Sequence, residues 1–568
     1  MLNKGFVMKK KILVGIDDFK EAIEEEYRYV DKTLLVSELL ESSKVVAITR
    51  PRRFGKTLNM SMLSYFFDVE NREKNRELFK GLAIEKSKYF NEHMGRYPVI
   101  FLSFKQVKSS NWDLAFDKIK GIIKQKYLEN KFLLDSEHLE EEEKKYFKSI
   151  LSGEASIDNI EESLVNLSRF MHKYHKEAVI ILVDEYDTPM IEGELKGYFE
   201  EVSEFMERLL GGAFKGNSDL YKGVMTGITR LQGAGIFSGL NNVEVCTVLD
   251  RRYRDKFGFT EEEVSELLKE YEMEDKEKSV REHYNGYNFR GEVIYNPYSV
   301  VRCIDINEIE NFWLGSSSND LAKKKLKELM EMGEDREIRK RVEELLQGRS
   351  IEIAIKNGIE ISDDMMEEEI LNLLLAAGYL KYENYESRKI GWYAEVSIPN
   401  REVEGVYMET LREWLGRKYT RYELVELGNF LKEMCEGGEE EIKKRLENFL
   451  ENRSMMDGFS KEMSYHNFMF GMLQGLIGEY EVESNRESGE GRYDIRLTPI
   501  SGSKEGIVVE FKIGEKDKLK ELSAKAVEQI EKQGYHKGFK VKGIKRARLV
   551  GIAFHKKKAE VTLKEVDL

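Results

Sequence analysis

The stretch VVAITRPRRFGKT, residues 45–57, decides the fold of the first half of the chain. Its opening residues, Val45–Thr49, are a short, mostly β-branched apolar run, which is typical of a buried parallel strand. Its closing residues, Gly55–Thr57, come directly before an apolar helical pattern at 58–67. A strand, a loop ending in Gly-Lys-Thr and a helix are the context of a phosphate-binding loop, so the sequence predicts an α/β domain with a parallel P-loop NTPase sheet.

This loop predicts specific contacts with a nucleotide. Backbone N–H groups and the helix N-terminus receive phosphates in such loops, so we expect binding by Arg53, Phe54, Gly55, Lys56 and Thr57. We expect the Lys56 ammonium to be exposed in the empty loop and to reach the β and γ oxygens, and the Thr57 hydroxyl to bind Mg²⁺. The usual motif begins with a glycine, and here that position is Arg50.

A second apolar run, Ala178–Val183, predicts the other half of the site. It is short and rich in β-branched residues, and its end presents Asp184 and Glu185 at the sheet edge where ligands bind. Asp184 would hold Mg²⁺, directly or through water, and Glu185 would polarise the attacking water. An Asp-Glu pair after a strand also fits a helix N-cap, but with the phosphate-binding loop it indicates ATP binding.

Two further stretches, 97–104 and 221–228, predict additional strands of the same sheet. Thr226 would lie at the end of its strand, where it could sense the γ-phosphate as sensor residues of AAA-type ATPases do. Its hydroxyl could equally satisfy a backbone group near Gly227. Both alternatives stay open at this point.

The C-terminal part contains a second acidic pattern. Residues 491–497 and 506–513 predict two strands of a hairpin, with Asp494 on one and Glu510 and Lys512 on the other. Side chains at positions i and i+2 share a face of a strand, so Glu510 and Lys512 would point together towards Asp494. Two carboxylates can hold Mg²⁺, and the ammonium can orient the attacking water or stabilise charge on a phosphate. The bland alternative is a solvated edge strand.

Asp494, the spacer and Glu510-x-Lys512 resemble the pattern of the PD-(D/E)xK nuclease superfamily. The resemblance implies that the acids bind Mg²⁺, with Mn²⁺ as the alternative, and that the lysine assists phosphodiester hydrolysis. Glu462, on a helix-like segment before the hairpin, matches a further acid that many members carry. Gln529, on a helical segment after the hairpin, is similar to the glutamine motif of the family.

A longer resemblance covers nearly the whole chain. It is carried by the segments 29–33, 50–57, 184–189, 237–242, 284–287 and 295–299. They resemble the prokaryotic family called AAA-ATPase-like, in which the form Arg-Pro-Arg-Arg-Phe-Gly-Lys is usual and a PD-(D/E)xK nuclease-like domain commonly ends the chain. We therefore expect an AAA-like P-loop ATPase domain at 1–257, a helical lid and winged-helix-like region at 258–400, a helical connector at 401–453 and a nuclease-like domain at 454–568.

Composition limits the partners and the location. The net charge of −14 argues against a protein whose whole surface is basic and binds DNA without sequence preference. However, residues 501–568 hold 17 Lys and Arg against 10 Asp and Glu, a net +7 beside the predicted nuclease site, which fits a nucleic-acid substrate such as DNA. Three scattered cysteines and the lack of a long apolar stretch predict a cytoplasmic protein without a membrane span.

The middle of the chain leaves its role open. Residues 284–299 are rich in Tyr, Asn and Gly, which favours a packed hairpin over rings that stack on a base. Residues 370–400 resemble a winged helix, a fold that binds DNA or other protein domains, and the acidic neighbourhood favours protein.

We expect an ATP-dependent switch or motor joined to a metal-dependent nuclease, with self-association as a further expectation. The alternative is a regulatory protein of the STAND type, in which nucleotide controls assembly and the nuclease-like domain recognises nucleic acid without cutting it.

Overall fold

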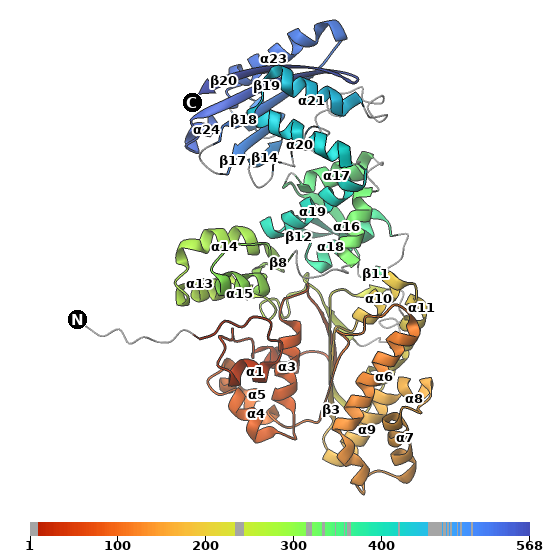
Figure 1. Ribbon diagram of the computed structural model, residues 1–568. Coiled ribbons are helices and arrows are strands. Elements are labelled where there is room, and N and C mark those ends of the chain that lie inside the picture. The colour runs from red at the N-terminus through yellow and green to blue at the C-terminus, as the bar shows by residue number, and fades with distance from the viewer. Residues whose placement is uncertain are drawn as a thin grey trace, which may run out of the picture. The chain divides into compact units, whose positions relative to one another are not determined.

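The computed structural model describes residues 10–568 except 233–242, 314–320, 332–335, 347, 357, 361–364, 419–420, 452–468, 470–472, 474–475, 477–479, 485–486, 489–490 and 501–503. The chain divides into two compact units, Met1–Tyr407 and Met408–Leu568. Each unit has a mixed helix and sheet architecture of its own (Figure 1).

A five-stranded parallel sheet in the order β2-β3-β4-β1-β6 organises the first unit. Its strands are β1 (Val45–Thr49), β2 (Val99–Ser103), β3 (Val179–Asp184), β4 (Leu220–Gly227) and β6 (Val243–Cys246). Every residue of β1 and of β3 is buried, as expected for parallel strands covered on both faces. The strands predicted from apolar runs are confirmed, and β6 was not predicted.

Helices cover both faces of this sheet (Figure 1). One group contains α1 (Phe19–Glu24), α2 (Leu35–Leu40), α3 (Lys56–Phe67), α4 (Arg72–Leu78) and α5 (Lys88–His93). The other contains α6 (Trp112–Glu129), α7 (Glu141–Ser152), α8 (Ile157–Glu161), α9 (Ser163–His175), α10 (Thr188–Lys196) and α11 (Phe199–Phe214). The sheet with its two helical layers is the α/β P-loop NTPase fold that the sequence predicts.

A small region of helices and short strands follows the sheet, and we call it the lid region after the sequence-based expectation. It consists of β7 (Phe259–Thr260), α13 (Glu261–Glu270), α14 (Glu277–Tyr284), β8 (Tyr287–Phe289), β9 (Glu292–Tyr295) and α15 (Pro297–Ile306). A capping box begins α13, with Thr260 and Glu263 bonded to each other's backbone N–H. In the β8–β9 hairpin, the buried Tyr287 ring lies 4.9 Å from the ring of Phe54, as the packed-hairpin alternative predicts.

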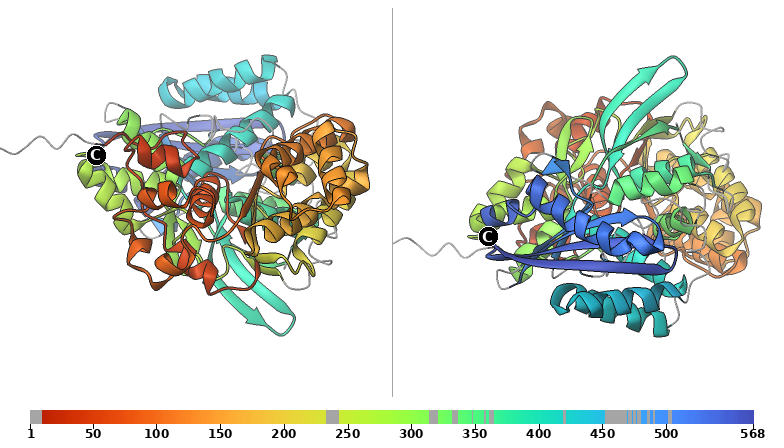
Figure 2. Two further views of the ribbon diagram at one scale, coloured as in Figure 1. Left: turned by 90° about the horizontal axis from the view of Figure 1, so that it is seen from below. Right: turned by 90° about the horizontal axis from the view of Figure 1, so that it is seen from above.

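The last part of the first unit has a three-stranded antiparallel sheet in the order β10-β13-β12. Its elements are α16 (Leu321–Glu331), α17 (Arg336–Leu346), β10 (Ile351–Ile355), α18 (Glu367–Ala377), β12 (Lys381–Arg388) and β13 (Gly391–Ser397). Figure 2 shows the β12–β13 hairpin as a long projecting wing. A short parallel pair, β5 (Leu231–Gln232) with β11 (Ile359–Glu360), links this part to the region after β4.

Helix α19 (Arg401–Lys418) begins in the first unit and, by its residue numbers, continues into the second. The second unit contains α20 (Arg421–Glu436), α21 (Glu439–Glu451), β14 (Tyr480–Ser484), β15 (Glu487–Ser488), β16 (Gly491–Arg492), β17 (Ile495–Pro499), β18 (Gly506–Ile513), α23 (Leu519–Gln533), α24 (Gly538–Val541), β19 (Arg546–His555) and β20 (Lys558–Asp567).

The sheet of the second unit has the order β14-β17-β18-β19-β20, in which only the β18–β19 pair is parallel. Successive side chains of β18 point to opposite faces of the sheet, so the strand contributes to two hydrophobic cores. Ile507, Val509 and Phe511 pack with residues of α20 and α21, whereas Val508 packs with residues of α23. The antiparallel β17–β18 pair confirms the predicted hairpin. In the part of the chain that the structure describes, no helix is both long enough and apolar enough to cross a membrane.

Candidate functional sites

The phosphate-binding loop lies between β1 and α3 and has two residues in the left-handed region. Gly55 has φ of 80° and Arg53 has φ of 68°. Lys56 is 5% exposed, and its ammonium donates to the carbonyl oxygens of Arg50 at 3.0 Å and Pro51 at 2.9 Å. The expectation of an exposed ammonium was therefore wrong, because the loop folds its own carbonyls around it. Burial also lowers the pKa of Lys56, while the nearby Glu185 and Asp184 oppose this effect.

Arg50, which replaces the usual first glycine, anchors the loop. Its fully buried guanidinium donates to the carbonyls of Thr49, Cys246, Arg252 and Tyr253 at 2.8–3.2 Å. The rings of Phe257 and Phe289 lie 5.7 and 5.2 Å from it. Arg50 is not among the residues with positive φ, so this loop does not require glycine at that position.

Asp184, at the end of β3, is the centre of the first acidic site. Its Oδ2 accepts a hydrogen bond from the Thr57 hydroxyl at 2.8 Å, and its Oδ1 accepts one from the Thr226 hydroxyl at 2.6 Å. Asp184 is fully buried, and burial raises its pKa. Thr226 thus bonds the acid itself, which links the loop, β3 and β4 through one carboxylate.

The segment after Asp184 makes a tight turn that is hydrogen-bonded to the residues after β4. Glu185 has φ of 52° and accepts from the Thr188 hydroxyl at 3.1 Å. Asp187 Oδ2 accepts from the backbone N–H of Ile228 at 2.7 Å and of Thr229 at 3.1 Å. Asp187 is fully buried, and burial raises its pKa to about 6. Sequence reasoning missed this residue, although a third acid within four positions was a signal.

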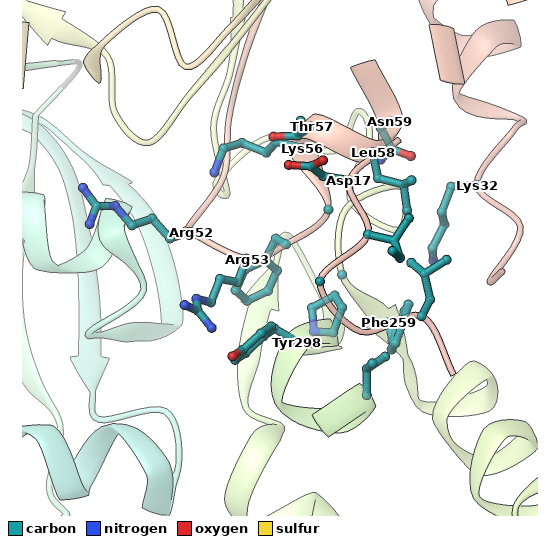
Figure 3. Close-up of a pocket in the computed structure, with 18 of the residues that line it drawn as sticks. Asp17, Lys32, Arg52, Arg53, Lys56, Thr57, Leu58, Asn59, Phe259 and Tyr298 are labelled. Atoms are coloured by element: carbon teal, nitrogen blue, oxygen red, sulfur yellow. The ribbon is translucent and has the colours of Figure 1, made fainter. Parts of the chain in front are cut away.

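A cavity of about 550 Å³ opens beside these groups (Figure 3). Its polar lining includes Arg52, Arg53, Lys56, Thr57, Lys105 and Glu185. Its apolar lining includes Ile12, Leu13, Ile16, Val30, Phe259 and Leu267. Lys105 forms an ion pair with Asp17 at 2.6 Å, and both side chains line the cavity. Figure 3 shows Arg53 turned towards Tyr298, and its guanidinium lies 3.7 Å from the centre of that ring.

The second acidic site lies in the second unit and unites four of the sequence-predicted residues. Glu510 Oε2 accepts from the backbone N–H of Asp494 at 3.4 Å, and Asp494 Oδ2 accepts from the backbone N–H of Phe511 at 2.7 Å. Glu510 Oε1 accepts from the Lys512 ammonium at 3.4 Å and from the amide of Gln529 on α23. Burial and the charge of Asp494 raise the pKa of Glu510, and Lys512 opposes this rise.

This donor set suits a hard divalent cation. Mg²⁺ keeps several waters and is commonly bound through one or two carboxylates, which Asp494 and Glu510 can supply. Burial first and the nearby charge of Asp494 second raise the pKa of Glu510, and a bound cation would stabilise both ionised carboxylates. Within the described residues, no group of three or more His, Cys, Asp or Glu side chains is placed to hold a metal. Glu462 lies outside the described residues.

Comparison with family models places both sites within recognised domains. Residues 13–237 match the model described as Predicted AAA-ATPase, and residues 460–564 match the PD-(D/E)XK nuclease superfamily. The chain carries an AAA-ATPase-like domain and a nuclease-like domain. The first match contains the phosphate-binding loop, Asp184 and Thr226, and the second contains Asp494, Glu510, Lys512 and Gln529.

The chain is also similar to one curated protein and to two solved structures, all at low sequence identity. The chain is 27% identical over 314 residues to the uncharacterized protein in the vnfD 5'region of Azotobacter chroococcum mcd 1, and the match spans about half of each protein, 54%. The Walker-type ATPase of Pyrococcus abyssi has a TM-score of 0.32 and 13% identity, over 71% of this chain and 98% of that one. The Aeropyrum pernix ORC1 protein in complex with DNA has a TM-score of 0.28 and 12% identity, over 69% and 95%.

Proposed function

We propose that the protein binds and hydrolyses ATP and cleaves nucleic acid, with DNA as the expected substrate, through a metal-dependent site in its second unit. The observation that carries the ATPase half is the pair of hydrogen bonds by which Thr57 and Thr226 hold Asp184. These bonds bring the helix N-terminus and two strand ends to one point beside the cavity. A hydroxyl and a carboxylate so placed are the groups that hold Mg²⁺ in P-loop enzymes.

The cavity beside this point fits a nucleotide by size and by chemistry. Its volume of about 550 Å³ lies in the range of small-molecule sites, roughly 300–1,000 Å³. Basic side chains and the N-terminus of α3 line the part suited to phosphates. The base would contact apolar side chains from the N-terminal segment and the lid, among them Leu13, Val30 and Phe259.

In the ATPase reaction, each group has a separate task. Lys56 leaves its loop carbonyls to bind phosphate oxygens, and Glu185 accepts a proton from the attacking water. The ion that Thr57 and Asp184 would hold supplies charge neutralisation on the phosphates when bound.

In the nuclease half, Asp494 and Glu510 would hold the cation that activates water and stabilises the phosphate. Lys512, whose ammonium lies 3.4 Å from Glu510 Oε1, would bind a phosphate oxygen or orient the water. Gln529 holds the orientation of the Glu510 carboxylate through its amide. The net positive charge of residues 501–568 would attract the polyanionic substrate.

The test of the ATPase half is nucleotide binding by purified wild-type protein and by Lys56→Ala. We expect the variant to lose ATP binding and to keep its fold, as followed by circular dichroism. Equal ATP affinity of the two proteins would refute the proposal. For the nuclease half, labelled DNA and RNA are incubated with the protein, with and without ATP, Mg²⁺ and Mn²⁺. Lack of cleavage of every substrate would refute that half.

A second candidate is a nucleotide-controlled regulatory protein whose second unit recognises nucleic acid without cutting it. The observation in its favour is that Lys56 is buried and bonded to the loop's own carbonyls, so the loop must rearrange before it binds phosphate. Such a rearrangement slows exchange of nucleotide. Slow single-turnover hydrolysis with retained ADP supports this candidate, whereas continuous hydrolysis stimulated by DNA supports the motor.

A further inference from the structure

Two arginines of the second unit are almost completely buried, and they differ in whether a carboxylate neutralises them. Arg548 on β19 is 4% exposed and forms an ion pair with Glu565 at 3.1 Å. Arg496 on β17 is 8% exposed, and no acid in the part of the chain that the structure describes forms an ion pair with it. The Nε of each arginine is buried without a hydrogen-bond partner, so the ion pair is the difference between them. A guanidinium stays charged when it is buried, so Arg496 lacks the negative partner that such groups normally have.

The acids beside Arg496 are bonded to other groups. Glu483 on β14 is the register partner of Arg496, and its carboxylate accepts from the Tyr493 hydroxyl at 3.3 Å. Glu481 lies two residues away on the same face of β14 and forms an ion pair with Lys542 at 2.9 Å. Neither carboxylate therefore pairs with the guanidinium of Arg496.

The guanidinium of Arg496 reaches to the first residues of α24, where a glycine makes room for it. It lies 4.3 Å from the ring centre of Phe539. A Cβ on Gly538 would lie only 2.9 Å from each of the two terminal nitrogens of Arg496. Gly538 is not among the residues with positive φ, so its backbone does not require glycine. The close approach of the guanidinium is what favours a residue without a side chain at this position.

The segment 532–545, which contains the end of α23 and all of α24, carries only positive charge, and we call it the basic turn. It holds five lysines and no Asp or Glu. Lys537 and Lys540 are exposed. Among the described residues, Lys542 is the only one of the five lysines in an ion pair. The unneutralised Arg496 thus lies beneath a surface of exposed lysines.

Arg496 and the basic turn both adjoin the second acidic site. Arg496 follows Asp494 by two residues, about 7 Å along an extended chain. Its register partner on β18 is Val508, which lies two residues before Glu510 on the same face. Gln529, which donates to Glu510, lies on α23, the helix that leads into the basic turn. Arg496 therefore lies on the same face of the sheet as the acids.

We propose that Arg496 and the basic turn bind the phosphate backbone of the nucleic-acid substrate, with the Arg496 guanidinium on a phosphate next to the one at the acids. This inference rests on the proposed nuclease function and names the surface that holds its substrate. A phosphate supplies the negative charge that Arg496 lacks, and a guanidinium can bind two phosphate oxygens at once. Such contacts position the backbone and carry no sequence preference of their own.

The test is the Kd of the full chain for a labelled DNA duplex, measured over a range of salt concentrations with EDTA present so that no cleavage occurs. We expect Arg496→Met to bind DNA about ten-fold more weakly. Its slope of log Kd against log salt should be smaller by about 0.9, as expected for one lost phosphate contact. Arg548→Met is the matched control, because it removes the same charge from a buried, ion-paired position of the same unit. It should change neither the affinity nor the slope.

A second variant guards against failure of Arg496→Met to fold. Gly538→Ala keeps every charge and places a methyl group against the guanidinium, so it should displace Arg496 and weaken DNA binding several-fold. Circular dichroism of each variant checks the fold.

The outcomes separate this inference from the proposed nuclease function. If Arg496→Met and Gly538→Ala bind DNA as wild type does, or if Arg548→Met loses as much affinity as Arg496→Met, the inference is overturned and the nuclease function is not. Wild-type protein that binds DNA through Arg496 but cleaves no substrate supports the binding surface and refutes cleavage. Wild-type protein that binds neither DNA nor RNA overturns both.

Discussion

The two acidic sites differ in the kind of hydrogen-bond donor that their buried acids receive. Asp184 receives neutral donors, one threonine hydroxyl on each carboxylate oxygen. Glu510 receives a lysine ammonium and an amide on one oxygen, and the backbone N–H of the neighbouring acid Asp494 on the other. Both acids are buried, and burial raises the pKa of both.

Because of this difference, the neighbours of Asp184 mainly fix the orientation of its carboxylate, whereas the neighbours of Glu510 mainly set the net charge of the site. Hydroxyls fix the direction of the Asp184 carboxylate, and Thr57 can turn from the acid to a cation without leaving a charge unpaired. At Glu510, by contrast, two carboxylates and one ammonium form a charge set, so removal of any member changes the net charge of the site. We therefore expect single substitutions to have larger effects in the second unit than in the first.

The sharpest test of this comparison is loss of one charge from the second site. Asp494→Ala removes one of two carboxylates and should lower DNA cleavage by about 10³-fold or more, since loss of metal catalysis is worth several kcal/mol. Lys512→Ala should lower cleavage similarly, yet leave Mn²⁺ affinity equal or higher because a cation near the ion is lost. Cleavage rates and Mn²⁺ titrations measure the two effects.

The control for this pair is Asp517→Ala, which removes an exposed acid from the same unit. If Asp494→Ala and Lys512→Ala cleave as fast as this control, the acids at this central strand, Asp494 and the buried Glu510, have no part in cleavage. Mn²⁺ binding that depends on Asp494 in a protein without cleavage would support the recognition alternative.

At the first site the largest effect should come from Glu185, which lines the cavity and does not hold Asp184. Glu185→Gln should bind ATP normally and hydrolyse it about 10²–10⁴-fold more slowly, the usual contribution of a general base. ATP affinity and single-turnover hydrolysis are measured on the same preparation. Unchanged hydrolysis would assign the base to another residue.

Local patterns in the sequence predicted the elements that place these sites. The β-branched runs at Val45–Thr49 and Val179–Asp184 gave their strands because both are buried on two faces, and alternation gave the β17–β18 hairpin. Gln529, which only the resemblance to the nuclease superfamily singled out, contacts Glu510. The strands could be predicted because their pattern depends on side chains only a few residues apart along the chain.

The missed features depend on residues that are distant in the sequence. Arg50 is anchored by carbonyls of Cys246, Arg252 and Tyr253, and no local pattern predicts those bonds. The burial of Lys56 follows from the same folded loop. Strand β6 alternates charged and apolar residues at an edge of the sheet, so it lacks the apolar run that marked the inner strands.

A smaller effect, on the free energy of unfolding, is expected at Asp187 in the turn that follows Asp184. Asp187→Ala leaves the N–H groups of Ile228 and Thr229 without their acceptor, which should cost about 2–4 kcal/mol of unfolding free energy. Asp187→Asn retains a carbonyl oxygen and should cost less than about 1 kcal/mol. Denaturant unfolding measures both. Equal losses in the two variants would show that the charge, and not the hydrogen bonds, matters.

The smallest effect should be a pH dependence of stability at Glu402, a buried acid in the first turn of α19. Burial raises the pKa of Glu402 to about 7 from 4.5, and Arg53 is the positive charge that opposes this rise. A raised pKa means that the folded state favours the protonated acid. The contribution of Glu402 to stability is therefore complete below pH 4.5 and is lost as the pH rises through 7.

Glu402→Gln carries no charge, so its stability should exceed that of the wild type progressively between pH 5 and 8. The gain should reach about 1–3 kcal/mol, since one pKa unit corresponds to about 1.4 kcal/mol. Thermal unfolding of the two proteins across this pH range, with Glu404→Gln as the control, measures the difference. A difference between Glu402→Gln and wild type that stays constant with pH would mean that Arg53 and the hydrogen bonds from Ser299 and Trp313 keep the acid ionised throughout.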